Sequence, residues 1–337
     1  MATIKDISKI VGVSPSTISR VLNYDDTIKV SYETRKKIFE AAENINYKTI
    51  SERKNKKEVY TKKIGIINWY SKQEELNDPY YLSISMGIEK RCCELGIDIV
   101  KIFKNYNLKK KEEKEFNGII ALGKFHESEI KKFSQLNDDI VVVDSCPDSN
   151  KYNSIVVDFK KAVTEIMDYL FSLGHKSIGY IGGKEFIGNE SIEYNDPREN
   201  TYKQILLKKN LLNNDYVSTG NFTESDGYKL MKDQLKLKKI PSAYFIASDS
   251  MAMGAMRAIY ESNLKIPEDI SVVGFNDIQY SNYLMPPLTT VKIFTEYMGK
   301  LAVEILLNKE MNFYIPLKIV VPTKFIERES CKSIIDD

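Results

Sequence analysis

The sequence predicts two structural classes within one chain, a small all-α domain at the N-terminus and a larger α/β body of two lobes. Residues 1–47 carry apolar positions at helical spacing, whereas short apolar runs alternate with amphipathic stretches from Ile64 onward. The length of 337 residues also exceeds that of one ordinary domain. These observations predict a helical head, a connecting segment and an α/β body.

Three short helices are predicted in the head. The first is an amphipathic run after Thr3, and Gly12 can adopt the left-handed conformation that follows a helix end. Ser14 and Pro15 then restart a helix as N-cap and first helical residue. A third helix begins near Ser31. Helix, glycine turn and helix together predict a helix-turn-helix.

The second helix has two unlike faces. Three apolar residues share the face that packs on the first helix: Ile18, Val21 and Leu22. Ser16, Arg20 and Asn23 lie on the opposite face, where a helix can enter the major groove of DNA and arginine can contact guanine. A plain two-helix hairpin of a helical domain is the alternative interpretation.

The distribution of charge favours DNA binding. Residues 1–63 contain 14 Lys and Arg against 8 Asp and Glu, and the remainder contains 35 against 39. Residues 48–63 include seven of the basic side chains and almost no apolar ones, which predicts a basic hinge or linker. A basic head on a mildly acidic body indicates that the head alone contacts a polyanion.

The sequence pattern of the body predicts repeated βαβ units. Nine apolar runs are predicted to be strands: 64–67, 98–103, 118–122, 140–144, 154–158, 177–183, 243–248, 270–275 and 288–293. Helical segments are expected between them, near 81–95, 126–135, 160–173, 198–209, 225–236, 249–262 and 295–307. Buried strands that alternate with helices predict parallel sheets with helices on both faces.

The head resembles the LacI/GalR family of transcription repressors. The likeness is carried by TIKDISKIVGVSPSTISRVLN (residues 3–23) and by VSYETRKKIFEAAENINY further on. It implies phosphate contacts from Thr3, Ser14, Ser19, Asn23, Ser31, Thr34 and Tyr47, and it puts Pro15, Ser16 and Arg20 at the base-reading positions. Since proline has no side-chain donor, direct readout is expected to rest on Ser16 and Arg20.

The hinge departs from the family pattern. Family members usually continue with a helix that places a leucine in the minor groove, but this chain has YKTISERKNKK, without proline or leucine. The leucine position falls on Asn55 or Lys56. We expect this segment to bind phosphates without intercalating, with a disordered hinge as the alternative.

The body, residues 64–330, resembles galactose-operon and evolved-β-galactosidase repressors of the same family. The likeness is carried by QEELNDPYYLSISMGIEKR, ASDSMAMGAMRAI and GFNDIQYSNYLMPPLTTVKI. It implies a two-lobed, periplasmic-binding-protein-like (type I) fold with a sugar in the cleft. The expected first lobe comprises about 64–158 and 282–309, and the second about 159–281 and 310–330.

Ser248, Asp249 and Asn276 lie at the ends of predicted strands, where open α/β sheets bind ligands. The family resemblance implies that Arg198, Ser248, Asp249 and Asn276 contact the effector. The aromatic residues nearest a strand end in the first lobe, Trp69, Tyr80 and Tyr81, are candidate partners for a sugar ring. Arg198 is preceded by a stretch, 184–197, that is expected to be a flexible loop. The alternatives are helix capping for Asp249, core packing for the two tyrosines and a surface ion pair for Arg198.

The sequence therefore predicts a repressor of a sugar-utilisation operon, released from DNA by galactose or a galactoside such as lactose or allolactose. A short recognition helix implies a homodimer on a palindromic operator. The absence of a signal peptide, a membrane span, a phosphate loop and a Cys/His cluster favours a cytoplasmic regulator without metal, cofactor or catalytic residues. A sugar-transport component and a sugar kinase or dehydrogenase are the alternatives from other classes.

Overall fold

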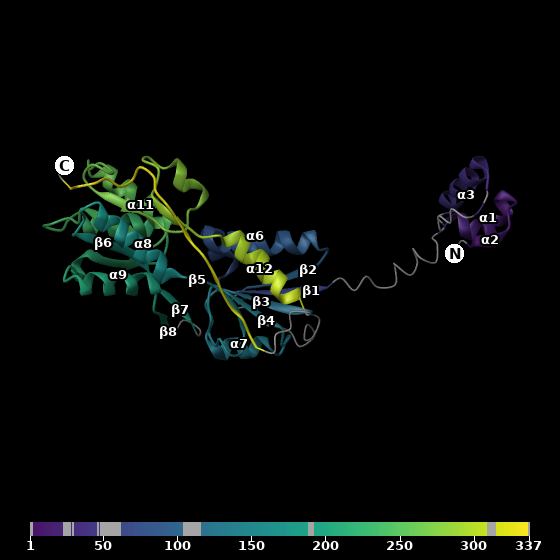
Figure 1. Cartoon of the computed structure of the whole chain (residues 1–337), viewed down its shortest axis with the longest axis horizontal. Helices are drawn as coiled ribbons and strands as arrows, with labels where there is room; N and C mark the ends of the chain where they lie inside the picture. The colour runs from purple at the N-terminus through teal and green to yellow at the C-terminus, as the bar shows by residue number, and fades with distance from the viewer. Residues whose placement is uncertain are drawn as a thin grey trace. The chain divides into compact units, whose positions relative to one another are not determined.

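The computed structural model describes residues 3–22, 28, 30–45, 47, 62–103, 116–187, 192–308 and 315–335. The chain divides into two compact units, Met1–Thr61 and Lys62–Asp337 (Figure 1). The predicted hinge at 48–63 lies outside the described residues except for Lys62 and Lys63, and so do Asn55 and Lys56.

The head contains the three predicted helices: α1 (Ile4–Val11), α2 (Pro15–Leu22) and α3 (Tyr32–Asn44). Gly12 ends α1 with φ at 71°, the left-handed conformation expected of it. A small apolar core holds the three helices together, and its fully buried members are Ile7, Ile18, Val21 and Ile38. The polar face of α2 is therefore directed away from this core.

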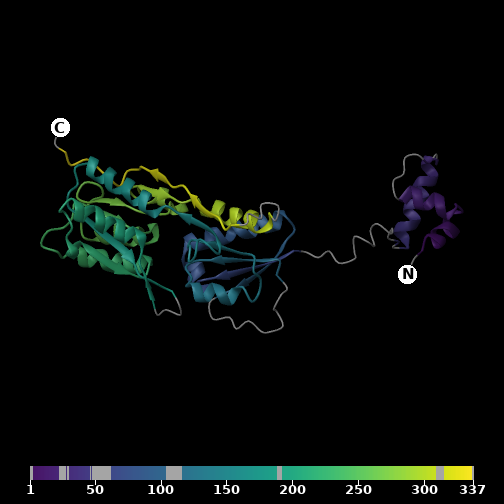
Figure 2. The ribbon, with the colours of Figure 1, turned by 60° about the horizontal axis from the view of Figure 1, so that its bottom comes forward.

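The first lobe of the body is a six-stranded, fully parallel sheet. Its order is β13 (Lys318–Val321), β5 (Asn153–Val157), β4 (Ile140–Val143), β3 (Gly118–Leu122), β1 (Lys63–Asn68) and β2 (Asp98–Ile102). Helices α6 (Pro79–Glu94) and α12 (Thr295–Leu307) pack side by side on one face. Figures 1 and 2 show α7 (Glu127–Phe133) on the other face. A short helix, α5 (Lys72–Asn77), precedes α6.

The second lobe has a four-stranded parallel sheet, in the order β11 (Ser271–Val273), β10 (Ala243–Ile246), β6 (Ile178–Gly183) and β9 (Val217–Gly220). Its helices pack as two pairs, α8 (Phe159–Ser172) with α9 (Pro197–Lys208), and α10 (Glu224–Gln234) with α11 (Asp249–Glu261). An antiparallel hairpin of β7 (Glu185–Ile187) and β8 (Ile192–Tyr194) follows β6. Both strands lie within the stretch 184–197, where a flexible loop was expected, so that expectation was wrong for residues 185–187 and 192–194.

The chain passes between the lobes three times: after β5, before α12, and between β13 and β14 (Lys324–Ile326). In the last two passes, β12 (Thr290–Lys292) pairs with β14 as an antiparallel ribbon. In Figure 1 the yellow C-terminal segment follows this path between the lobes.

Two boundaries of the predicted lobes need correction. β13 lies within 310–330, which was assigned to the second lobe, yet it extends the first sheet by pairing with β5. Leu288 lies within 282–309, which was assigned to the first lobe, yet it packs in the second-lobe core. Both errors arise because pairing between distant segments, rather than local pattern, decides where a crossover strand lies.

The nine predicted strands are all present, whereas β7, β8, β9, β13 and β14 were not predicted. The missed strands have three or four residues each, too short for a clear apolar period. Within the described parts of the chain, no helix is long and apolar enough to span a membrane.

Candidate functional site

The base-reading residues predicted on α2 lie on its exposed face, Pro15 and Ser16 in the first turn and Arg20 in the last. Pro15, Ser16 and Arg20 are exposed and Ser19 is partly buried, while the neighbouring Ile18 is fully buried. This arrangement presents a polar helix face that can enter a groove. Asn23, the last predicted member of that face, lies outside the described residues.

The hydroxyl groups predicted to bind phosphate also cap helices. Ser14 Oγ accepts a hydrogen bond from Thr17 N at 3.2 Å, and Ser31 Oγ accepts one from Thr34 N at 3.2 Å. Thr3 donates its backbone N–H to Asp6 at 2.9 Å, and this bonding lowers the pKa of that carboxyl. These residues fix the starts of the three helices. Tyr47 is partly buried beside the head core.

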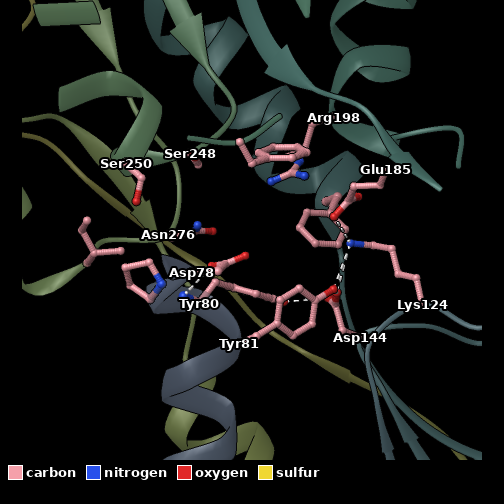
Figure 3. Close-up of a pocket in the computed structure, with 14 residues that line it drawn as sticks. Asp78, Tyr80, Tyr81, Lys124, Asp144, Glu185, Arg198, Ser248, Ser250 and Asn276 are labelled. Carbon is pink, nitrogen blue, oxygen red and sulfur yellow. Dashed lines mark hydrogen bonds and ion pairs between the residues drawn. The ribbon is translucent and has the colours of Figure 1, made fainter. Parts of the chain in front are cut away.

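A small polar cavity lies between the two lobes of the body (Figure 3). The residues that line it come from strand ends and helix starts of both lobes: Asp78, Pro79, Tyr80, Tyr81, Lys124, Asp144, Phe159, Glu185, Arg198, Phe222, Ser248, Ser250, Asn276 and Ile278. Five of the seven predicted effector residues are among them, and Trp69 and Asp249 are not.

Asp144, which directly follows β4, connects the polar groups of the first lobe. Its carboxylate accepts the hydroxyl hydrogens of Tyr80 and Tyr81, each at 2.6 Å, and it lies 3.2 Å from Lys124 Nζ. Burial and the adjacent carboxylate raise the pKa of both phenols, so they remain protonated donors at neutral pH. The tyrosines are therefore both core residues and members of the cavity wall.

Lys124, shortly after β3, connects the two lobes. Its ammonium donates to Glu185 Oε1 of the β7–β8 hairpin at 2.9 Å and to Tyr81 Oη at 3.2 Å. Burial alone would lower the pKa of Lys124, but attraction by Asp144 and Glu185 outweighs it and raises that pKa. The same ammonium lies 5.3 Å from the ring centre of Tyr194. A charged lysine thus bridges a first-lobe and a second-lobe carboxylate.

Arg198, at the start of α9, is buried and paired rather than on the surface. Its Nε lies 3.0 Å from both carboxylate oxygens of Asp196, and its Nη2 lies 2.7 Å from Oδ2. Nη1 donates to the Ala247 carbonyl at 2.8 Å. The guanidinium carbon lies 4.8 Å from the ring centre of Phe222 and 5.4 Å from that of Phe159. The ion pair expected as the alternative exists, but it is built into the cavity wall.

Asp249 lies outside the cavity and forms hydrogen bonds with segments near it. Its carboxylate accepts hydrogen bonds from Ile278 N at 2.9 Å, Ser281 Oγ at 2.7 Å and Thr290 Oγ1 at 2.7 Å. Burial raises the pKa of Asp249 to about 6. Asp249 therefore fixes the segments that follow β11 and does not reach the cavity. The cap of α11 is the neighbouring Ser248, whose Oγ accepts from Met251 N at 3.2 Å.

Trp69 lies behind the tyrosines, with its ring 4.9 Å from that of Tyr70 and 6.0 Å from that of Tyr81. It packs in the first-lobe core rather than facing the cavity. Asn276 does line the cavity, and its φ of 112° belongs to the left-handed side of the backbone map, which L-residues rarely adopt.

Asp78 is a carboxylate that the sequence analysis did not predict. It is the N-cap of α6, and its Oδ1 accepts from Tyr80 N at 2.9 Å. Burial raises the pKa of Asp78 to about 6, against the effect of the Tyr80 hydrogen bond. The Asp-Pro pair at 78–79, a typical helix start, was the available signal.

Lys124 and Glu185 were also missed. Lys124 follows the predicted strand 118–122 by two residues, so the strand-end rule used for Ser248 could have found it. Glu185 likewise follows the predicted strand 177–183 by two residues, so the same rule could have found it, although the hairpin that fixes it was not predicted.

The comparison with known proteins now decides the family. Residues 3–49 match the bacterial regulatory proteins of the lacI family, and residues 167–331 match the periplasmic binding protein-like domain. The chain is 35% identical over 336 residues, 98% of each chain, to the transcriptional repressor MelR of Bacillus subtilis. It is 38% identical to the regulator GalR of Streptococcus thermophilus, over 96% of each chain. The chain belongs to the lacI family.

Solved structures show the same fold. The lac repressor dimer bound to operator and the anti-inducer ONPF matches with a TM-score of 0.70 at 24% identity, covering 98% of this chain and 99% of that one. The complex of the regulator CelR with cellobiose matches with a TM-score of 0.68 at 22% identity, covering 98% and 100%.

This lacI-family protein is thus a DNA-binding transcriptional repressor with a helical head and a periplasmic-binding-protein-like body. Members of its family are regulators rather than enzymes, which sets aside the kinase, dehydrogenase and transport alternatives. Regulators of this family bind sugar effectors rather than cofactors. In the described parts of this repressor, no group of three His, Cys, Asp or Glu side chains is placed to hold a metal ion.

The raised pKa of Asp78 predicts a pH dependence of stability. The folded repressor holds this carboxyl with a pKa of about 6, against 3.8 for an ordinary aspartate. The destabilisation caused by its buried charge is complete above pH 6 and disappears as the pH falls towards 4. Relative to Asp78→Asn, the unfolding free energy of the wild type should therefore rise by roughly 1–3 kcal/mol between pH 7 and pH 4.

Urea unfolding of both proteins across this pH range measures the difference. Asp138→Asn, at an exposed position between α7 and β4, serves as a control for general charge effects. A constant difference between wild type and Asp78→Asn from pH 7 to pH 4 would show that Asp78 titrates normally.

Proposed function

We propose that this repressor controls a sugar-utilisation operon of the galactose or lactose type and leaves its operator when a galactoside binds between the lobes. The observation that carries the proposal is a cavity whose wall combines hydrogen-bonding side chains from both lobes with aromatic rings. Relatives named GalR and GanR support the choice of sugar, at 38% and 34% identity.

The head supports sequence-specific binding through α2. Arg20 is exposed on the face opposite the apolar contacts of Ile18 and Val21, so its guanidinium can reach a base edge when the helix enters the major groove. Ser14 and Ser31 cap helices, and Thr34 lies in the first turn of α3; helix N-termini of this kind favour phosphate binding.

Replacement of Arg20 tests the reading of bases. Arg20→Ala should weaken binding to an operator selected from random DNA by about 1–3 kcal/mol and relax the preference at one base pair. Fluorescence anisotropy with operator and scrambled DNA measures both effects. Lys9→Ala removes an equal charge from α1 and should affect the two DNAs alike. Operator binding by Arg20→Ala that matches the wild type would contradict the assignment.

The cavity suits a pyranose. Asn276, Ser248 and the free faces of Asp78 and Glu185 offer hydrogen bonds to hydroxyl groups, while Phe222 offers a flat apolar surface. Because the wall comes from both lobes, a bound sugar changes the free energy of one lobe arrangement more than that of another. A tenfold loss of operator affinity requires about 1.4 kcal/mol of such coupling.

The Arg198–Asp196 pair provides the test of the effector site. Arg198→Ala alone would leave the buried Asp196 carboxylate without its ion-pair partner. The double substitution Arg198→Gln with Asp196→Asn removes both charges and is therefore the better test. It should weaken binding of galactose, lactose or allolactose by at least about tenfold and abolish release of DNA, with sugar-free operator binding unchanged.

Calorimetry measures sugar binding by this variant, and anisotropy measures operator release. The matched control is Lys203→Gln with Glu199→Gln, a partly exposed pair on the same helix that does not line the cavity. Sugar binding that survives in the double variant would place the effector elsewhere. No heat from any of the three sugars with the wild type would reject a galactoside.

A homodimer is proposed from an exposed apolar surface on the body. A groove over α6, the segment after β11 and the start of α12 is lined in part by Met86, Phe294, Tyr280 and Tyr297. Of these, Met86 is 58% exposed and Tyr280 61% exposed. Gathered apolar side chains of this kind mark an interaction surface, and two heads are needed for tight binding to a palindromic site.

Substitution of Met86 tests the dimer. Met86→Asp should place a charge in the interface and raise the dissociation constant of the dimer by at least about tenfold, as measured by sedimentation equilibrium. Leu207→Asp on α9, where Leu207 is 64% exposed, is the control and should leave the mass unchanged. A monomeric wild type, or an unaltered Met86→Asp dimer, would contradict this surface.

A further inference from the structure

The charges on the cavity wall distinguish between classes of sugar, an inference that rests on the proposed function. Three carboxylates line the cavity, Asp78, Asp144 and Glu185, against two cations, Lys124 and Arg198. The side chain of Lys124 is 6% exposed and that of Glu185 7% exposed, so water screens these charges weakly.

Both cations are already compensated by carboxylates. The three hydrogens of the Lys124 ammonium meet three acceptors: Asp144 at 3.2 Å, Glu185 at 2.9 Å and Tyr81 Oη at 3.2 Å. Arg198 directs Nε and Nη2 to Asp196, which compensates its charge, and Nη1 to a backbone carbonyl. These bonds use three of its five N–H groups, and the other two can donate to a hydroxyl oxygen of a neutral sugar.

Glu185, by contrast, has one carboxylate oxygen that can still accept a hydrogen bond. Oε1 receives the Lys124 hydrogen bond, whereas Oε2 is buried and has no hydrogen-bond partner among the described residues. A buried oxygen without a partner is costly, so a donor supplied by a ligand would be favourable. Figure 3 shows the Glu185 carboxylate directed towards the space between Lys124 and Arg198.

We propose that the cavity selects an uncharged, hydroxyl-bearing sugar and rejects its phosphorylated and carboxylated derivatives, with Glu185 as the discriminating residue. A sugar hydroxyl donates a hydrogen bond to the free oxygen of Glu185. A phosphate or carboxylate at the same place offers acceptors only, and its charge is repelled by Glu185 and Asp78.

The experiment compares galactose with galacturonate, which carries a carboxylate in place of the terminal hydroxymethyl group, and with galactose 6-phosphate. Glucose, glucuronate and glucose 6-phosphate form a second series. Calorimetry of the full chain should give an affinity for the neutral sugar at least about 100-fold above that for either anion. Glu185→Gln keeps the shape and removes the charge, and it should reduce this ratio at least about tenfold.

Glu193→Gln is the matched control, because Glu193 lies on the same hairpin but is exposed and pairs with Lys184. It should leave the ratio unchanged, and thermal unfolding of both variants checks that they fold. An anion that binds the wild type as tightly as its neutral parent, or a ratio that Glu185→Gln leaves unaltered, overturns the proposal.

The experiment distinguishes a failure of the proposed galactoside effector from a failure of the proposed selection by charge. Binding of neutral glucose but not of galactose rejects the galactoside effector and supports selection by charge. Release of operator by galactose 6-phosphate rejects selection by charge and supports a sugar-controlled repressor. Binding of neither series overturns both.

Discussion

The bridge from Asp144 through Lys124 to Glu185 is the contact on which the arrangement of the cavity depends. Lys124 belongs to the first lobe and Glu185 to the second, and their 2.9 Å contact is almost fully buried. A buried ion pair is weak evidence for added stability, since the loss of hydration offsets much of the attraction. Its consequence is geometric: without this contact Lys124 still pairs with Asp144 of its own lobe, whereas Glu185 of the second lobe loses its ion pair.

The other polar groups follow from this constraint. Asp144 accepts from Tyr80 and Tyr81, which orients the Tyr81 ring against Trp69 and Tyr70 and fixes the start of α6. In the second lobe, Arg198 and Asp196 form a closed pair beneath three phenylalanine rings. The cavity thus has rigid walls, and the contact between Lys124 and Glu185 is where the two walls meet.

The features of the fold and the site that could be predicted were those determined by residues close together in the sequence. Strand 118–122 and the recognition helix follow from apolar period and capping, which a few neighbouring residues determine. Asn276 was found because ligand-binding side chains gather at strand ends, and Arg198 because the family resemblance implied it. The same rule misassigned Asp249, since it says which end of a strand a residue occupies and not which way its side chain points.

Pairing between strands that are distant in the sequence could not be predicted from local sequence patterns. β13 joins the first sheet through contacts with residues more than 150 positions earlier, such as Asn153 with Leu317, and no period within KIVV reveals that partner. Glu185 illustrates the effect on the site: a glutamate in an expected loop becomes a buried cavity residue once the pairing of β7 with β8 fixes it. Buried charges were the least predictable, because each depends on a partner that only the fold supplies.

The interlobe contact also sets the scale for regulation. An effector changes operator affinity only through unequal affinity for two lobe arrangements, and a tenfold change needs about 1.4 kcal/mol. A hydrogen bond to a charged group contributes about 1.5–3 kcal/mol, so one new bond from a sugar to Glu185 suffices in magnitude. Since Glu185 already holds Lys124 of the opposite lobe, a ligand that binds it acts directly on the contact joining the lobes. Recognition of the sugar and control of the lobe arrangement can therefore share one carboxylate.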